Sequence, residues 1–547
     1  MTLLTNVIAG SILIQTRMYF LEKMRPAANA RASLRLRRYR AGAALAVLFA
    51  TASGAGWGQS SQSGSGTRAV QLPLSGGQQA GASVEQSATP SSTSSVNTLS
   101  TQVHVQGAYA GSVLDPNPPT GKVALTLAEA IRRGLEFNLG KIGADAASRQ
   151  AQAQRISERS SLLPTLSASV SENAAKIDLQ AEGFSASAFG ATGFNFPTTV
   201  GPFHYYDLRG SLQQNLLDLT AIHNYRSARQ SADAAGFDAG QAREEVVLAV
   251  TGTYLQMMAT TALIDAQQVE VQYGEASYKQ ARAQADAGNK APIDANRSLV
   301  ELQTEQQRLR SQLGDLQKQK NSLARLIGLP LSLEIEITEK LQSLPSQIAT
   351  VEDAVQRSWT QRQDLKSAEA QLRAAEEARK AAGAEHLPSA TVNGYYGMQG
   401  SNPNQGNGVF QASASLNVPI FSGGRMHADA VQADAVITER KAELSNARGA
   451  MELDVRNAYI DWTVANDQVG TAESNRKLAL ATLQQSQDRF AVGVADSVEV
   501  VNSQEALAAA DHDYVSSLFS QNLAKIALAH AMGEAEKDIP DLFKGSK

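Results

Sequence analysis

The sequence predicts a mainly helical fold with a β-barrel part, built from two tandem repeats that each contain a long helical hairpin and two amphipathic strands. Three observations support this prediction. Landmark residues recur at nearly constant offsets along the 547 residues, apolar residues follow heptad spacing over very long stretches, and shorter segments alternate apolar with polar residues. A two-copy repeat of this length indicates two structurally equivalent halves rather than a solenoid.

The composition limits the classes of protein to which the chain can belong. Charged residues make up 19% of the chain and apolar residues 43%, whereas a polytopic helical membrane protein would show several uncharged runs of about 20 apolar residues. The net charge of -4 argues against a dedicated nucleic-acid binder, so we expect no nucleic-acid partner. The absence of cysteine excludes disulfides, thiolate metal sites, cysteine nucleophiles and a lipidated N-terminal cysteine.

No pattern in the sequence indicates catalysis, a cofactor or a metal site. The 7 histidines show no metal-ligand spacing, and there is no complete dinucleotide-type glycine fingerprint, nucleophile elbow or P-loop. We therefore expect a protein that is not an enzyme and that needs no cofactor or metal.

The first 120 residues are predicted to lie outside the ordered fold. Residues 1–56 contain a cluster of arginines, a short apolar run at 41–50 and then small residues, which is the order of a secretory signal. Met18 or Met24 is a possible natural start, and the alternative interpretation of this segment is a buried helix preceded by charges. Residues 57–120 are rich in Ser, Gln, Gly and Thr and predict a disordered linker, because they cannot bury enough apolar surface.

The remaining chain is an internal duplication. Leu163-Pro164 recurs 224 residues later as Leu387-Pro388, and Gly288 recurs 205 residues later as Gly493. The change of offset predicts an insertion of about 20 residues in the first half, between roughly residues 172 and 204. The boundaries that follow are 121–345 for the first repeat, 346–534 for the second and 535–547 for a C-terminal tail.

Each repeat is predicted to begin with a helix, over residues 125–162 in the first copy and 351–386 in the second. Thr126 and Glu129 have the spacing of a capping box at the start of the first helix. The Leu-Pro pairs end both helices, because the residue before a proline disfavours the helical conformation.

Two segments with alternating apolar and polar residues follow each of these helices. Residues 410–420 place apolar side chains at even positions and polar ones at 411, 413, 415 and 417, and residues 206–216 show a similar pattern. A period of two with one apolar face predicts strands, which we pair with strands near 165–171 and 389–398.

Two very long helices end each repeat. Leu299, Leu302, Leu309, Leu313 and Leu316 step along the chain with heptad spacing, which predicts antiparallel helical hairpins. The outgoing helices should run for about 60 residues, or about 90 Å at 1.5 Å per residue. The hairpin tips are predicted at Ala287-Gly288-Asn289 and Val492-Gly493-Val494, where glycine ends one helix before the next begins.

A sheet of four amphipathic strands leaves the backbone N–H and C=O groups of its two edge strands without hydrogen-bond partners. If the apolar face meets lipid, the sheet must close, because unpaired backbone groups are too costly in hydrocarbon. Four strands cannot close a barrel, since the smallest membrane barrels use eight. The barrel is therefore predicted to be shared between subunits.

Together these features resemble the TolC-type outer membrane efflux protein family over about residues 125–533. The resemblance rests on the tandem repeat, on the two tips, and on the strand-to-helix junction VPIFSGGR at 418–425. It implies a homotrimer in the bacterial outer membrane, with twelve strands forming one barrel in outer membrane lipid and twelve helices forming a periplasmic coiled-coil tunnel. It further implies export of small molecules or proteins in a tripartite efflux or type I secretion system. The implied partners are a periplasmic adaptor (membrane fusion) protein and an inner membrane efflux pump or ABC exporter.

The resemblance also implies residues for a gate and a docking surface. Members of the family close the periplasmic end of the tunnel with acidic residues just after the second tip glycine, and the matching positions here are Glu499 and Asn502. Asp294 is the first-repeat equivalent of Glu499, and Phe490 stands where a tyrosine is common. The alternative for Asp294 and Glu499 is a pair of solvated carboxylates that stabilise helix starts. The six tip residues 287–289 and 492–494 are the expected docking surface for the adaptor.

Two other classes of protein remain as alternatives at this stage. One is a periplasmic coiled-coil adaptor or scaffold, which would have helical hairpins but no repeated pair of amphipathic strands. The other is an exported hydrolase with a coiled-coil arm, which would need a polar catalytic constellation.

Overall fold

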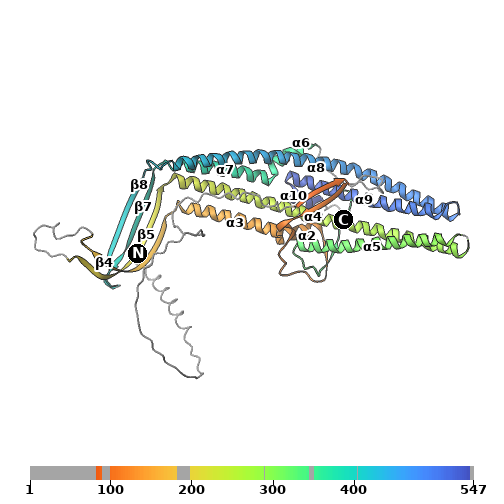
Figure 1. The fold of residues 1–547 in the computed structure, drawn as a ribbon, viewed down its shortest axis with the longest axis horizontal. Coiled ribbons are helices and arrows are strands. Elements are labelled where there is room, and N and C mark those ends of the chain that lie inside the picture. The colour runs from red at the N-terminus through yellow and green to blue at the C-terminus, as the bar shows by residue number, and fades with distance from the viewer. Residues whose placement is uncertain are drawn as a thin grey trace, which may run out of the picture. The chain divides into compact units, whose positions relative to one another are not determined.

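The computed structural model describes residues 82–88, 99–181, 197–288, 290–343, 350–402 and 404–542. The expected secretory signal at 1–56 lies outside the described residues. Figure 1 shows that the described part consists mainly of long helices and a sheet of long strands, to which two short strand pairs are added.

The two halves contain the same elements in the same order. The first half has α2 (Leu127–Phe137), α3 (Leu139–Ser160), β4 (Thr165–Asp178), β5 (Thr199–Leu217), α4 (Leu219–Asp286) and α5 (Pro292–Leu326). The second half has α6 (Val351–Gln361), α7 (Gln363–Ala384), β7 (Ser389–Gly400), β8 (Asn407–Asn417), α8 (Arg425–Ala491) and α9 (Ser497–Met532). A short helix, α10 (Ala535–Leu542), follows.

The first helix of each half is interrupted, so the expectation of one continuous helix over 125–162 and over 351–386 is wrong. Asn138 has an extended backbone (φ -67°, ψ 132°) between α2 and α3, and its side-chain oxygen accepts a hydrogen bond of 2.8 Å from the amide of Gly140. Asn138 thus caps α3, a role that asparagine fills well. In the second half the break falls at Arg362, whose backbone is also non-helical (φ -59°, ψ 128°).

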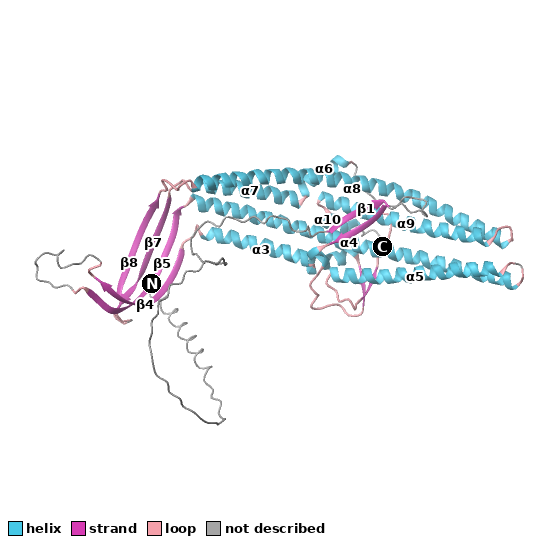
Figure 2. Ribbon diagram, viewed as in Figure 1, coloured by secondary structure: helices cyan, strands magenta, loops and turns pink. Residues whose placement is uncertain are grey.

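The strands form one antiparallel sheet in the order β4-β5-β7-β8 (Figure 2). The hairpin pairings β4–β5 and β7–β8 confirm the strand pairs expected from the alternating pattern. The two halves are joined by pairing of β5 with β7. The strands β4 and β8 are left at the edges, so the sheet of one chain is open.

The strands differ in extent from the prediction. β4 continues to Asp178 and β5 already begins at Thr199, so both strands run into the region expected to be an inserted connection between residues 172 and 204. β8 ends at Asn417, so the alternation that continues to Ile420 in the sequence does not continue as strand.

The four long helices confirm the two predicted hairpins. α4 and α8 contain 68 and 67 residues, and α5 and α9 return over 35 and 36 residues. Gly288 and Gly493 lie at the turns between them with φ of 74° and 79°. Glycine is favoured there because a side chain would be strained in the left-handed region.

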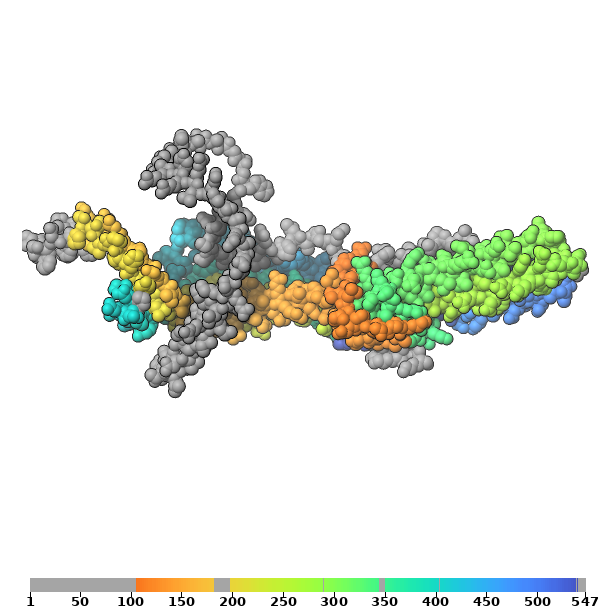
Figure 3. All heavy atoms as spheres, turned by 90° about the horizontal axis from the view of Figure 1, so that it is seen from below, coloured from red at the N-terminus to blue at the C-terminus, as the bar shows by residue number. Residues whose placement is uncertain are grey.

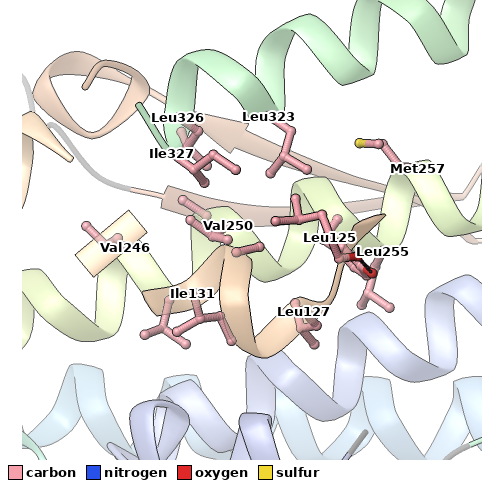
Figure 4. Packing of buried hydrophobic residues seen from close by; sticks show 14 of the residues in the cluster. Leu125, Leu127, Ile131, Val246, Val250, Leu255, Met257, Leu323, Leu326 and Ile327 are labelled. Atoms are coloured by element: carbon pink, nitrogen blue, oxygen red, sulfur yellow. Dashed lines mark hydrogen bonds between the residues drawn. The ribbon is translucent and has the colours of Figure 1, made fainter. Parts of the chain in front are cut away.

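The main core lies where α2, α4 and α5 meet (Figure 4). Leu125, Val250 and Leu323 are fully buried there. Leu125 belongs to a parallel strand pair that the sequence did not reveal, β3 (Lys122–Leu125) with β6 (Glu334–Ile337). Among the described helices α4 alone is long and apolar enough to cross a membrane, but most of its apolar stretch is buried inside the fold. Core packing therefore accounts for its composition.

The expectation of disorder over 57–120 is wrong for the described part of that range. Residues 82–88 form β1 and residues 99–105 form β2, which pair antiparallel, and a 3-10 helix, η1, spans Gly107–Ala110. Tyr109 is the anchor, because it packs against the core and its carbonyl accepts a hydrogen bond from the side chain of Asn138. In Figure 3 the orange start of the coloured chain, which contains η1, lies against the green segment that contains α5 and β6.

Candidate functional site

The sheet exposes a continuous apolar face. Residues paired directly across neighbouring strands share one face of a sheet. The apolar pairs are Leu166 with Leu212, Val170 with Leu208, Leu208 with Met398, and Tyr396 with Phe410. Leu166 is 77% exposed and Phe410 is 78% exposed in the single chain. An exposed apolar face of this kind fits contact with lipid, and the open edges fit pairing with further strands.

The opposite face of the sheet is polar and carries charge. Arg209 on β5 donates a hydrogen bond of 2.6 Å from Nε to Asp207, and its guanidinium lies 4.4 Å from the ring centroid of Tyr395 on β7. On the neighbouring strands the hydroxyls of Thr391 and Ser415 are hydrogen-bonded at 2.8 Å. A polar face suits the water-filled interior of a barrel.

The hairpin tips expose small and apolar side chains. Val492 and Val494 are 75% and 70% exposed, and Gly288 and Gly493 have no atom within 4 Å of an added Cβ. Ala287 is also exposed. Asn289, the remaining expected docking residue, lies outside the described residues.

The structure places Asp294 at a contact between the two hairpins. Its carboxylate Oδ1 accepts a hydrogen bond of 2.8 Å from the hydroxyl of Ser497, which begins α9. Arg297, one helical turn after Asp294, lies 3.4 Å from the same carboxylate oxygen and donates to the Ser497 hydroxyl at 3.2 Å. The three residues, which we call the hairpin latch, join the first turns of α5 and α9.

Glu499 is not part of the hairpin latch. Its nearest cation is Arg489 near the end of α8, with 3.5 Å between Nε and Oε1. Its amide donates to the carboxylate of Asp496, which caps α9 at 3.0 Å. Asn502, one turn further along α9, is exposed.

Phe490 is buried, with 4% of its surface exposed. It packs in an apolar cluster that joins the end of α8 to the start of α9, together with Leu483, Ala495, Val500 and Leu507. The ammonium of Lys290 lies 5.4 Å from the ring centroid of Phe490. In the single chain the Phe490 ring therefore packs within the second hairpin and also lies near a cation of the first hairpin.

The sequence predicted Asp294 and Glu499 in this region but not the residues that bind their carboxylates. Arg297, Ser497 and Arg489 were missed, although Arg297 follows Asp294 by three residues, a spacing that brings side chains together on a helix. Among the described residues no group of three or more His, Cys, Asp or Glu could hold a metal ion.

Comparison with known families gives a match over both halves of the chain. The sequence profile of a family described as "Outer membrane efflux protein" matches residues 143–329 and 354–534. These two stretches span well over half of the chain, and each contains one of the two long hairpins.

Curated relatives are similar over most of their length. The "Pyoverdine export outer membrane protein OpmQ" of Pseudomonas putida is 26% identical over 408 residues, covering 70% of this chain and 81% of that protein. The "Toluene efflux pump outer membrane protein TtgF", also of Pseudomonas putida, is 25% identical over 394 residues, covering 69% of this chain and 76% of that protein.

Solved structures share the fold. The CmeC outer membrane channel of Campylobacter jejuni matches with a TM-score of 0.63 at 16% identity, covering 77% of this chain and 90% of that chain. The outer membrane protein VceC of Vibrio cholerae matches with a TM-score of 0.62 at 19% identity, covering 74% and 96%. The arrangement of open sheet and long hairpins is thus that of known outer membrane channels.

Proposed function

The chain belongs to the outer membrane efflux protein family, and from this membership we propose that three copies of it assemble into one export duct. The protein is an outer membrane channel of the tripartite efflux type, with its strands in the outer membrane and its helical tunnel in the periplasm. Membership of this family and the repeated pair of strands both favour a channel. The two alternatives that the sequence left open, a periplasmic coiled-coil scaffold and an exported hydrolase, are less well supported.

The observation that carries the proposal of shared assembly is the open amphipathic sheet. One chain supplies four strands with an apolar face and two unpaired edges. In lipid those edges need partners, and barrels of the outer membrane contain at least eight strands. Three chains would supply twelve strands, pairing β8 of one protomer with β4 of the next.

We propose that the hairpin tips dock on a periplasmic adaptor, which links the channel to an inner membrane efflux pump or ABC exporter. The exposed valines at 492 and 494 support this role, because an apolar surface at the end of a helical body suits contact with another protein. The opposing tip carries Gly288, whose lack of a side chain permits close approach of a partner.

The cargo is proposed only as a class. One relative is named for pyoverdine export and another for toluene efflux. Because relatives of similar identity carry different cargo, we propose that the pump selects the cargo and that this chain supplies the passage through the outer membrane.

We further propose that the hairpin latch and Glu499 control the periplasmic mouth. In a trimer, Asp294 and Glu499 would each be present three times near the tunnel end, with Asn502 exposed one turn above. The hairpin latch would hold the two hairpins of each protomer together in the closed state, since charge-assisted hydrogen bonds are among the stronger polar contacts. Phe490 would support the mouth by packing rather than by hydrogen bonding.

The test of the channel function combines location with conductance. The protein should be extracted by detergent from the outer membrane fraction, should migrate as a heat-modifiable oligomer, and should conduct ions after insertion into planar lipid bilayers. Recovery in the soluble periplasmic fraction, without conductance, would instead support the scaffold.

A further inference from the structure

We propose that a cluster of buried and half-buried carboxylates between the two hairpins takes up and releases protons and thereby sets how readily the hairpins separate. This inference rests on the proposed channel function, because separation of the hairpins matters if it widens the tunnel mouth. The cluster, which we call the seam cluster, consists of Glu270 on α4, Glu301 and Glu305 on α5, and Asp511 on α9.

The seam cluster lies deeper in the helical body than the hairpin latch. Tyr273, one turn from Glu270 on α4, packs against the apolar cluster of the second hairpin that contains Phe490 and Leu507. On the other side, Val269 and Asp511 line one pocket of about 350 Å³ between α4, α8 and α9. Glu270 therefore sits where the first hairpin contacts the second.

Two of the four carboxylates already have cationic or amide partners. Glu305 is 5% exposed and is bound by the side chains of Gln267 and Arg308. Asp511 is bound by Arg476 on α8, whose guanidinium lies 5.2 Å from the ring centroid of Tyr514. The guanidinium groups of Arg308 and Arg476 are thus already paired with Glu305 and Asp511.

Glu270 is the carboxylate left without compensation. It is 5% exposed, and no described residue donates a hydrogen bond to its Oε1, which is fully buried. The charges that act on Glu270 are those of Glu301, Glu305 and Asp511, all acidic. An ionised carboxylate in such a place is costly, because it is both desolvated and repelled by its neighbours.

Charge counting over the elements packed around Glu270 leads to the same conclusion. The charged groups of these elements that act on Glu270 or on its neighbours in the seam cluster are Glu301, Glu305 and Arg308 on α5, Glu505 and Asp511 on α9, and Arg476 on α8. Including Glu270, five carboxylates face two guanidinium groups. The packed seam is therefore more stable when at least one carboxyl group carries a proton.

The pKa values follow from this environment. Burial first, and then repulsion by Asp511, Glu305 and Glu301, raises the pKa of Glu270 to about 7 from an ordinary 4.5. Burial and a hydrogen bond with Glu305 raise the pKa of Glu301 as well.

The direction of the pH dependence follows from the raised pKa of Glu270. Below its ordinary pKa of 4.5 the group is protonated whether the hairpins are packed or separated, so the packed seam is not penalised. Between 4.5 and about 7, separated hairpins release the proton while packed hairpins retain it, so packing loses stability as pH rises. Above about 7 the loss is complete, and the hairpins separate most readily.

The experiment is single-channel recording of the trimer in planar bilayers, with the pH on the side of the hairpin tips varied from about 5.5 to about 8.5. The pKa difference limits the effect to about 300-fold per group, and we expect about tenfold because opening exposes the carboxylate only in part. Open probability of the wild type should rise with pH, with a midpoint near the pKa of about 7.

Two variants assign the effect to the seam cluster. Glu270→Gln mimics the protonated side chain at every pH, so its open probability should stay at the low value that the wild type shows in acid. Glu301→Gln should reduce the amplitude of the pH response. The control is Glu275→Gln on the same helix, whose side chain is 47% exposed and which should keep the wild-type profile.

The outcomes separate this inference from the channel function. A wild-type channel whose open probability is flat over this pH range would overturn the inference while leaving the channel intact. A pH response in Glu270→Gln equal to that of the wild type would also overturn it. Absence of any oligomer or conductance in the wild type would instead contradict the channel function itself.

Discussion

At the level of single residues, a few polar contacts join segments that lie far apart in the sequence. Asp294 and Ser497 are 203 positions apart yet hydrogen-bonded, and Tyr254 reaches the carbonyl of Leu125 at 2.8 Å. Contacts of this kind fix how one hairpin sits against its neighbours, which heptad packing alone leaves variable.

Removing the carboxylate of the hairpin latch should open the channel. Asp294→Ala deletes the acceptor for the Ser497 hydroxyl and the carboxylate next to Arg297, at a cost of about 1–2 kcal/mol per protomer. Open probability in planar bilayers should rise by roughly five- to thirtyfold. The matched control is Asp286→Ala, because Asp286 pairs with Arg282 on its own helix and joins no hairpins. An equal rise in both variants would contradict the hairpin latch.

Removing the hydroxyl of Tyr254 should destabilise the core without closing or opening the channel. Tyr254 is fully buried, and its hydroxyl lies within hydrogen-bond distance of two acceptors, the carbonyl of Leu125 and the carboxylate of Glu339, to one of which it donates its proton. Burial and Glu339 keep the pKa of its phenol far above the usual range. Tyr254→Phe should cost about 1–3 kcal/mol, because a buried acceptor loses its donor. Thermal unfolding of the detergent-solubilised protein measures this, with the exposed Tyr396→Phe as a control that should unfold like the wild type.

At the scale of elements, the strands should show opposite tolerance on their two faces. Leu416→Arg puts a charge on the apolar face and should cost about 2–4 kcal/mol if it lies near the middle of the bilayer. Ser415→Arg, one position away on the polar face, should be tolerated. The measurement is the yield of heat-modifiable oligomer in the outer membrane, and equal loss in both variants would mean that the faces are wrongly assigned.

The elements that the sequence predicted well are those with long, regular patterns. Heptad spacing over tens of residues predicted both hairpins, and clean alternation predicted the strands, because each pattern repeats often enough to exclude the other. The short pair β3–β6 was missed, since its two strands have four residues each and lie more than 200 positions apart. The break at Asn138 was missed because apolar spacing continues across it, through Leu135, Leu139 and Ile142.

The site was predictable only in part, for a similar reason. Asp294 and Glu499 were found because each lies six residues after a tip glycine. Their partners Ser497 and Arg489 were not found, because the register between neighbouring helices depends on packing along their whole length. The burial of Glu270 was not predicted either, since a single glutamate on a long helix gives no sign in the sequence of being covered by a second hairpin.

At the scale of the whole molecule, the two halves are built alike even where their residues differ. Thr126 and Thr350 cap equivalent helices, and the helix breaks at Asn138 and Arg362 have the same offset of 224 although one residue is an amide and the other a cation. The break therefore belongs to the fold rather than to a residue type. Because the two halves have the same architecture, each chain supplies two equivalent pairs of strands and two equivalent hairpins. This repetition suits a duct assembled from repeated parts.

In the proposed assembly, one chain is an incomplete part of a barrel and three chains complete it. The most direct measurement is the mass of the assembly in mild detergent, determined by light scattering or native mass spectrometry. The account predicts about three times the mass of the mature chain, with no stable monomer in lipid, because the edges of β4 and β8 need partners. A stable monomer inserted in a bilayer would contradict the account.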